Sequence, residues 1–326
     1  FYIFHSAFYM DDGVIRSHVN AMSTRDFQTF SEPILHISGR EDGWIGMCAP
    51  DIQYLNGTYY LTFNSWGDKP DKLNQLFYKT SKDLEHWSER KPLAKNLTDG
   101  IRAIDVTMTY EAGKYIILYK EKQTMRLAMG DSPGGDFEFI GDGLPRFYEK
   151  DGQKIDWHEN CNFYKIDGQW YILTVDSPHA SHLYRMKGDG NKPEDFLVWE
   201  DGYMLDIPQR SYNTTEVSNA SGLADWREHD GHFYLIHAGQ TDEHAFAGRG
   251  WQKLCLARSK DLIHWEAATD RAKVAPHVTI TSPAQGASFE SNLDIPVKAT
   301  ATDPNGDAVV KMEFFLNDDK VAEDNI

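Results

Sequence analysis

Three acidic residues lie near the starts of predicted strands. Asp51, Asp105 and Glu159 each begin an aliphatic or aromatic stretch that leads to a Gly-containing turn and a second aromatic strand. If the starts of these strands surround one axis, the three carboxyl groups converge on one pocket. Such a set can hydrolyse a glycosidic bond, because one protonated carboxyl donates to the leaving oxygen and another activates water from the opposite side. The alternative is that each acidic residue binds turn amides or faces water.

The ends of the second strands supply further candidates, because second strands end on the face where first strands start. Trp66 can stack on a sugar face or pack into the core. Lys120 can contact a hydroxyl or a substrate carboxylate, although a solvated surface position is the commoner fate of lysine. The candidates for sugar binding are Asp51, Asn64, Trp66, Lys120, Asp176, His179, His237 and Gln240.

A repeated phrase indicates how these strands are arranged. An aspartate followed within a few residues by Trp or Phe occurs in the segments 25–30, 82–87 and 260–265, and in looser form in 136–139 and 194–199. A spacing of about 50 residues is typical of a four-stranded propeller blade. We therefore expect an all-β fold in which residues 1–270 form a five-bladed β-propeller.

Turn residues support the same register. Asn56-Gly57, Ala112-Gly113, Asp167-Gly168 and Asp230-Gly231 each separate two strand-like stretches, as in β-hairpins. The opening residues, 1–6, match a second strand. The first strand of blade one is therefore expected upstream of residue 1.

The character of the chain changes after residue 270. We expect a linker at 271–277 and part of an immunoglobulin-like β-sandwich at 278–326, because strands alternate there with Pro and Gly turns. The stretches VTITSPAQGASF and ATATDPNGDAVVKMEFFLN resemble bacterial immunoglobulin-like repeats of secreted polysaccharide enzymes. This resemblance implies a secreted or cell-surface bacterial protein, and the module is expected to continue past residue 326.

Composition excludes several classes of partner. The formal net charge of −17 disfavours nucleic acid and anionic membrane surfaces. No apolar run reaches the roughly 18 residues that span a bilayer, so membrane insertion is not expected. Three distant cysteines, Cys48, Cys161 and Cys255, make no disulfide framework and are expected to be buried thiols.

Three segments carry a family resemblance. CAPDIQYLNGTYYLTF, AIDVTMTYEAGKYIILY and HENCNFYKIDGQWYIL resemble, in order and register, segments of the five-bladed propeller glycosidases of glycoside hydrolase family 43. The resemblance covers about residues 1–270. It implies that Glu159 is the general acid, that Asp105 raises its pKa and orients it, and that Asp51 lines the pocket near the sugar. The general base of that family is an Asp on the first strand of blade one.

The chain departs from the family pattern at three positions. Cys48 stands where the family has Trp, Glu159-Asn160-Cys161 stands for Glu-Gly-Pro, and Leu223 stands where a histidine lies near a bound cation. No cofactor is required, and no metal ligand is assigned. Structural calcium could be bound by the segment 303–307, which is more simply a hairpin turn.

We expect an inverting glycoside hydrolase, and the family resemblance implies that its substrates are arabinose-, xylose- or galactose-containing polysaccharides or their oligomers. A retaining propeller glycosidase, related to the fructan-cleaving enzymes, is one alternative. A propeller that binds carbohydrate without cleaving it is another. Exchange of Glu159 for Gln discriminates between an enzyme and a binding protein.

Overall fold

The computed structural model describes most of the 326 residues. The positions outside the described residues are 12, 41, 145–147, 151–152, 156–157, 177–179, 201, 211–212, 214–220, 240–252, 269–276, 291–293, 303–308, 310, 318 and 326. Contacts divide the chain into two units, Phe1–Ala268 and Thr269–Ile326. Of the linker predicted at 271–277, only His277 is described, and β22 begins there.

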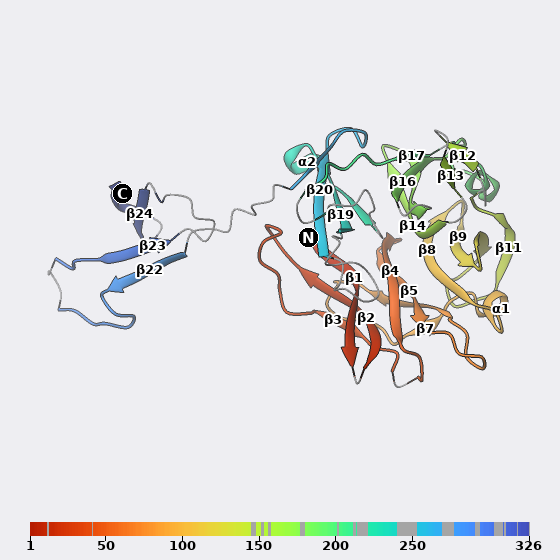
Figure 1. The fold of residues 1–326 in the computed structure, drawn as a ribbon, viewed down its shortest axis with the longest axis horizontal. Helices are drawn as coiled ribbons and strands as arrows, with labels where there is room; N and C mark the ends of the chain where they lie inside the picture. The colour runs from red at the N-terminus through yellow and green to blue at the C-terminus, as the bar shows by residue number, and fades with distance from the viewer. Residues whose placement is uncertain are drawn as a thin grey trace. The chain divides into compact units, whose positions relative to one another are not determined.

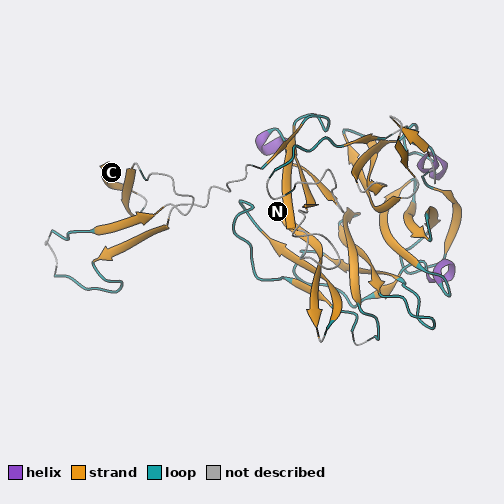
Figure 2. Cartoon of the chain, in the orientation of Figure 1, coloured by secondary structure: helices purple, strands orange, loops and turns teal. Residues whose placement is uncertain are grey.

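The first unit is a five-bladed β-propeller, which confirms the fold predicted from the repeat. Figure 1 shows the blades following one another around a ring, from red through yellow and green to cyan. Figure 2 shows that strands make up nearly all of its regular structure. Blades two to five each contain a four-stranded antiparallel series, and blade one contains three described strands.

The strands of each blade follow in chain order. Blade one has β1 (Tyr2–Asp11), β2 (Val14–Ser23) and β3 (Leu35–Ile37); blade two has β4 (Gly46–Leu55), β5 (Thr58–Trp66), β6 (Leu76–Ser81) and β7 (Lys91–Pro92). Blade three has β8 (Ala103–Glu111), β9 (Lys114–Glu121), β10 (Thr124–Gly130) and β11 (Phe137–Asp142). Blade four has β14 (His158–Ile166), β15 (Gln169–Asp176), β16 (Ala180–Arg185) and β17 (Tyr203–Met204); blade five has β18 (Ser221–Asp225), β19 (Phe233–Gly239), β20 (Lys253–Ser259) and β21 (Trp265–Ala267).

Smaller elements connect these strands. They are the helices α1 (Lys95–Thr98) and α2 (Arg227–Asp230), a 3₁₀ helix at Pro193–Leu197, and a hairpin of β12 (Tyr148–Lys150) and β13 (Gln153–Ile155). The strands β2 and β4 pair in parallel at one position, Ser17 with Gly46. This pairing joins the sheet of blade one to the sheet of blade two.

Two-residue turns join the first and second strands of blades two to four. Asn56-Gly57, Ala112-Gly113 and Asp167-Gly168 all have positive φ at both positions, between 49° and 79°. This geometry is that of a type I′ hairpin turn, which matches the twist of the flanking strands. Blade five differs from the prediction, because the one-turn helix α2 lies between β18 and β19 and ends at Gly231.

The Asp-aromatic phrase forms a self-contained turn after the third strand of a blade. In blade two the Asp83 carboxylate accepts the main-chain N–H groups of Glu85 and His86, at 3.0 and 2.8 Å, and the Trp87 indole donates to the Leu84 carbonyl. Blade five repeats these bonds around Asp261. In blade one the same turn follows β2, so β1, β2 and β3 correspond to the second, third and fourth strands of the other blades.

Apolar side chains fill the interfaces between neighbouring blades. Four buried clusters join blades one to two, two to three, three to four and four to five, with Phe63, Met108, Phe163 and Leu235 as one member of each. An aromatic group connects blade five with blade one: Phe1 lies 4.5 Å from Trp226 and 5.8 Å from Tyr234, between ring centroids. Burial of such surface stabilises the ring by about 25 cal/mol per Å².

The second unit contains two antiparallel hairpins. They are β22 (His277–Ser282) with β23 (Lys298–Thr302), and β24 (Lys311–Leu316) with β25 (Asp319–Asn325). Alternation of apolar and polar residues along β22 and β24 gives each hairpin one apolar face. The segment 303–307, considered above for calcium, lies outside the described residues.

Candidate active site

A β-bulge near the start of each of the inner strands β4, β8 and β14 decides where the acidic side chains lie. The register shifts between Cys48 and Asp51, between Ile104 and Thr107, and between Glu159 and Asn162. In each bulge one residue has left-handed φ: Ala49 at 53°, Asp105 at 53° and Asn160 at 49°. Bulges re-aim side chains next to functional sites.

The three predicted carboxylates therefore occupy different positions of the same bulge. Glu159 directly precedes the left-handed residue, Asp105 is that residue, and Asp51 follows it by two. A bulge re-aims the side chains around it, so the three carboxyl groups meet different partners. Asp51 departs from the expected convergence, because its carboxylate is bound by Thr107 and Gln53.

Glu159 forms an ion pair with Lys120 across the boundary of blades three and four. The Lys120 Nζ lies 2.6 Å from the Glu159 Oε1, and the Lys120 side chain is 4% exposed while that of Glu159 is 33% exposed. The Thr174 hydroxyl donates to the Glu159 main-chain carbonyl at 2.9 Å and fixes this part of β14. The partly exposed carboxyl of Glu159 can still meet a ligand.

Asp105 lies beside this pair and is buried, with 7% of its surface exposed. Burial, together with the negative charge of Glu159, raises the pKa of Asp105 to about 7, while Lys120 and the Asn160 main-chain N–H oppose the rise. The structure thus brings Asp105, Glu159 and Lys120 together, as the sequence suggested for the two carboxylates. The proton of this group is held more readily by Asp105 than an ordinary aspartate would hold it.

Asn64 supports Asp105 rather than facing the pocket. Its Oδ1 accepts the main-chain N–H of Asp105 at 2.9 Å, and its Nδ2 donates to the Cys48 Sγ at 3.3 Å and to the Ser65 carbonyl at 2.9 Å. The side chain is 1% exposed. The predicted sugar-binding role of Asn64 is therefore replaced by a positioning role, in which it holds a left-handed backbone position.

Asp51 is buried between three inner strands. Its carboxylate accepts from the Thr107 hydroxyl at 2.7 Å and from the Gln53 Nε2 at 3.3 Å, and Gln53 also donates to the Phe163 carbonyl at 3.0 Å. Burial raises the pKa of Asp51 to about 6, although these hydrogen bonds oppose the rise. Asp51 ties β4, β8 and β14 together, and the structure does not place it against the Asp105–Glu159 pair.

Cys48 occupies the position at which family 43 enzymes carry Trp. The thiol is 9% exposed. Burial, and next the charge of Asp105, raise the pKa of the Cys48 thiol far above its ordinary value, so the thiol is neutral. A small, uncharged group thus lies next to the carboxylates.

Trp66 packs against Phe8 at the end of the propeller where the inner strands start. The ring centroids are 5.3 Å apart and the planes meet at 83°, in an edge-to-face arrangement. Trp66 ends β5 opposite Gly46, with which β4 begins, and its side chain is half-buried. The exposed part of the indole can meet a ligand, while the rest packs on Phe8.

The remaining predicted residues come from blades four and five. Asp176 ends β15 and pairs with His158 at the start of β14. His237, in β19, is 2% exposed, and burial lowers its pKa to about 4, so it is a neutral buried histidine. His179 and Gln240 lie outside the described residues.

Sequence reasoning missed two residues of this region. Thr107 is the hydrogen-bond partner of Asp51, and its hydroxyl also accepts the main-chain N–H of Phe163 at 3.2 Å. The charge of Arg102 acts on Asp105, and Arg102 also forms a 2.6 Å ion pair with Asp68. Alignment of the segment 48–51 with the segment 104–107 would have found Thr107, because Thr107 then falls at the Asp51 position of the next blade.

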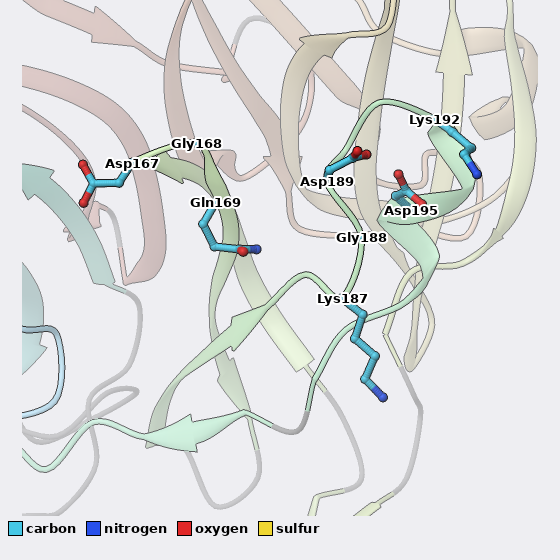
Figure 3. Close-up of a pocket in the computed structure, with 8 residues that line it drawn as sticks. All are labelled: Asp167, Gly168, Gln169, Lys187, Gly188, Asp189, Lys192 and Asp195. Carbon is cyan, nitrogen blue, oxygen red and sulfur yellow. The ribbon is translucent and has the colours of Figure 1, made fainter.

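A hollow with a volume of about 620 Å³ lies elsewhere on blade four (Figure 3). Its lining residues are Asp167, Gly168, Gln169, Lys187, Gly188, Asp189, Lys192 and Asp195. Asp167 and Gly168 form the turn that follows β14, whereas Glu159 lies at the start of that strand. The hollow is thus at the opposite end of the blade from the carboxylates, and it contains none of the predicted site residues.

Within the described residues, no group of three or more His, Cys, Asp or Glu side chains is placed to hold a metal ion. The helices that the structure describes include none long and apolar enough to cross a membrane.

The propeller resembles solved glycoside hydrolases. A glycoside hydrolase family 43 arabinoxylan arabinofuranohydrolase from Bacillus subtilis is 14% identical, with a TM-score of 0.50, and the match covers 68% of this chain and 51% of that one. A structure described as a glycoside hydrolase is 18% identical (TM-score 0.49; 69% and 48% covered), and an α-L-arabinofuranosidase from Clostridium thermocellum is 15% identical (TM-score 0.49; 65% and 68% covered). The chain therefore spans about half the length of two of these proteins.

The likeness to the Bacillus subtilis structure supports the propeller fold of this chain. The structural neighbours of this chain are family 43 glycoside hydrolases. Residues 276–326 match the bacterial Ig domain family, as the resemblance of that segment predicted. No curated protein matches the chain by sequence.

Proposed function

We propose that this protein is a glycoside hydrolase that cleaves arabinose-, xylose- or galactose-containing polysaccharides or oligosaccharides with inversion at the anomeric carbon. The observation that carries the proposal is the pairing of a buried carboxyl, Asp105, with a partly exposed one, Glu159, between neighbouring inner strands. A buried carboxyl beside a partly exposed one is an arrangement in which one group can tune the other for acid catalysis. The substrate class rests on the resemblance of the sequence to glycoside hydrolase family 43, and the Bacillus subtilis neighbour is an arabinoxylan arabinofuranohydrolase.

In this mechanism Glu159 is the general acid. Its carboxyl reaches the surface of the site and donates its proton to the leaving oxygen as the glycosidic bond breaks. Asp105 acts through Glu159, because a nearby negative charge disfavours ionisation of a second carboxyl. Inverting hydrolysis places the water-activating carboxylate about 6.5–9.5 Å from the acid, on the other face of the sugar. Asp105, buried beside Glu159, lies on the acid's side and serves the acid.

The test is Glu159→Gln, assayed against arabinan, arabinoxylan and galactan with the anomer of the first product followed by NMR. We expect kcat/KM to fall by about 10²–10⁴-fold, with sugar affinity and Tm retained. Glu138→Gln, an exposed position on the outer strand β11, is the matched control. Unchanged turnover in the Glu159 variant overturns the assignment, and a retained anomer overturns inversion.

A carbohydrate-binding propeller without turnover is the second candidate. It is favoured by the Lys120–Glu159 ion pair, because the ammonium at 2.6 Å occupies the carboxyl oxygen that a general acid would present to the leaving oxygen. Isothermal titration of the unaltered protein with the same polysaccharides separates the two candidates. Binding without any release of sugar supports the second, and release that depends on Glu159 supports the first.

We also propose that the protein acts at the cell surface or after secretion. The match of residues 276–326 to the bacterial Ig domain family supports this location. Fractionation of cells that carry the full-length gene tests it. Recovery of the protein with the cytoplasmic fraction alone would contradict the proposal.

A further inference from the structure

A buried lysine in contact with a proposed acid needs an explanation of its own. Lys120 ends the second strand of blade three and pairs in register with Ile104, the residue before Asp105. Its ammonium crosses to blade four and meets Glu159 at 2.6 Å. Lys120 therefore lies next to both carboxyl-bearing residues, with only 4% of its side chain exposed.

The two carboxyls differ in what surrounds them. Asp105 is buried at a left-handed backbone position, with its main-chain N–H held by Asn64. Glu159 is a third exposed and in direct contact with an ammonium. Burial disfavours the charged form of a carboxyl group, and a neighbouring opposite charge favours it, so the surroundings of Asp105 and Glu159 act in opposite directions.

The other groups that face this pair do not replace Lys120. Arg102, just before β8, acts on Asp105 but forms an ion pair with Asp68 at 2.6 Å. Cys48, on β4, is a buried thiol in the neutral form, and Asn64, on β5, carries no charge. In the described part of the site, Lys120 is thus the cation that contacts the Glu159 carboxyl directly.

We propose that Lys120 is a positioning residue that decides which carboxyl holds the proton. In the free protein Lys120 keeps Glu159 ionised and leaves the proton on Asp105. A bound sugar draws the ammonium onto its own oxygens, and the proton then passes from Asp105 to Glu159. When the glycosidic bond breaks, that proton leaves with the departing oxygen, and Glu159 pairs again with Lys120. This inference rests on the proposed function.

The first test needs no substrate. Infrared titration follows the carbonyl band of protonated carboxyl groups, and subtraction of Asp105→Asn from the unaltered protein isolates the Asp105–Glu159 pair and cancels the band of Asp51. We expect a difference band whose midpoint lies near neutral pH. In Lys120→Met the midpoint should move to higher pH by about 1–3 units, because a positive charge has been removed. In Lys120→Arg, which keeps the charge, it should stay within about half a unit.

Two results overturn the proposal: the absence of a difference band, or a midpoint that Lys120→Met leaves in place. Should the Met variant fail to fold, Lys120→Gln is used for the same reading.

The second test uses turnover. Loss of the positive charge should move the basic limb of the pH profile of kcat/KM upward in Lys120→Met and should raise KM, while Lys120→Arg restores the profile. A purely structural lysine would lower stability and leave the limb in place. If the protein hydrolyses none of the polysaccharides, the proposed function fails, and the infrared titration still decides where the proton lies.

Discussion

The buried carboxyl of Asp51 should make the stability of the propeller depend on pH. Asp51 is 7% exposed, and burial raises its pKa from the ordinary 3.8 to about 6. A pKa that is higher in the folded state than in the unfolded state means that the folded protein is more stable when Asp51 is protonated. This contribution to the free energy of unfolding is fully present below about pH 4 and is lost as the pH rises through 6.

The size of the effect follows from the shift. About 2 pKa units correspond to about 3 kcal/mol of the free energy of unfolding, at 1.36 kcal/mol per unit. Asp51→Asn removes the ionisation but keeps a carboxamide that can accept from Thr107. The stability of the Asn variant relative to the unaltered protein should therefore rise by about 3 kcal/mol between pH 4 and pH 8. Asp105 titrates in both proteins and cancels.

Urea unfolding followed by Trp fluorescence measures this difference. All nine Trp residues of the chain lie before residue 269, so the signal reports the propeller and not the second unit. Asp71→Asn, at an exposed position, is the matched control and should show no trend with pH. A flat difference between pH 4 and pH 8 would refute the reasoning. If Asp51→Asn lost sugar binding while its stability stayed unchanged, the prediction that Asp51 lines the sugar-binding pocket would be supported.

Two further substitutions test how the site is held. Asn64→Ala should lower the free energy of unfolding by about 1–3 kcal/mol, because it leaves the buried N–H of Asp105 without its acceptor; equal urea midpoints would contradict this. Gly46→Ala should cost about 1–3 kcal/mol or more, because its Cβ would lie 2.0 Å from the Ser17 carbonyl oxygen. The control is Gly222→Ala, whose Cβ would meet nothing within 4 Å, and equal losses in the two Gly variants would argue against the close approach of β2 and β4.

The order of the blades could be predicted from local signals. Turn residues with positive φ, such as Asn56 and Gly57, are readable because few residue types adopt that conformation. The Asp83 turn is readable for a similar reason, since all its hydrogen bonds close within a few residues. Where the local signal was looser, the structure differs: Asp195 lies in a 3₁₀ helix rather than in such a turn.

The direction of the side chains could not be predicted in the same way. A bulge adds one residue to a strand and reverses the alternation that follows, and no residue type announces it. Ala49, Asp105 and Asn160 share the left-handed position yet have nothing else in common. The assignments of Asp51 and Asn64 depended on this alternation, whereas the pairing of Asp105 with Glu159 depended only on the order of the blades.

The three cysteines provide internal reporters of partial opening. Cys48, Cys161 and Cys255 are 9%, 2% and 5% exposed, and they lie in blades two, four and five. A thiol reagent reaches such a side chain only when its surroundings open, so labelling rates in native buffer measure opening blade by blade. Mass spectrometry of the labelled peptides would then show whether the propeller unfolds cooperatively or whether one blade unfolds before the others.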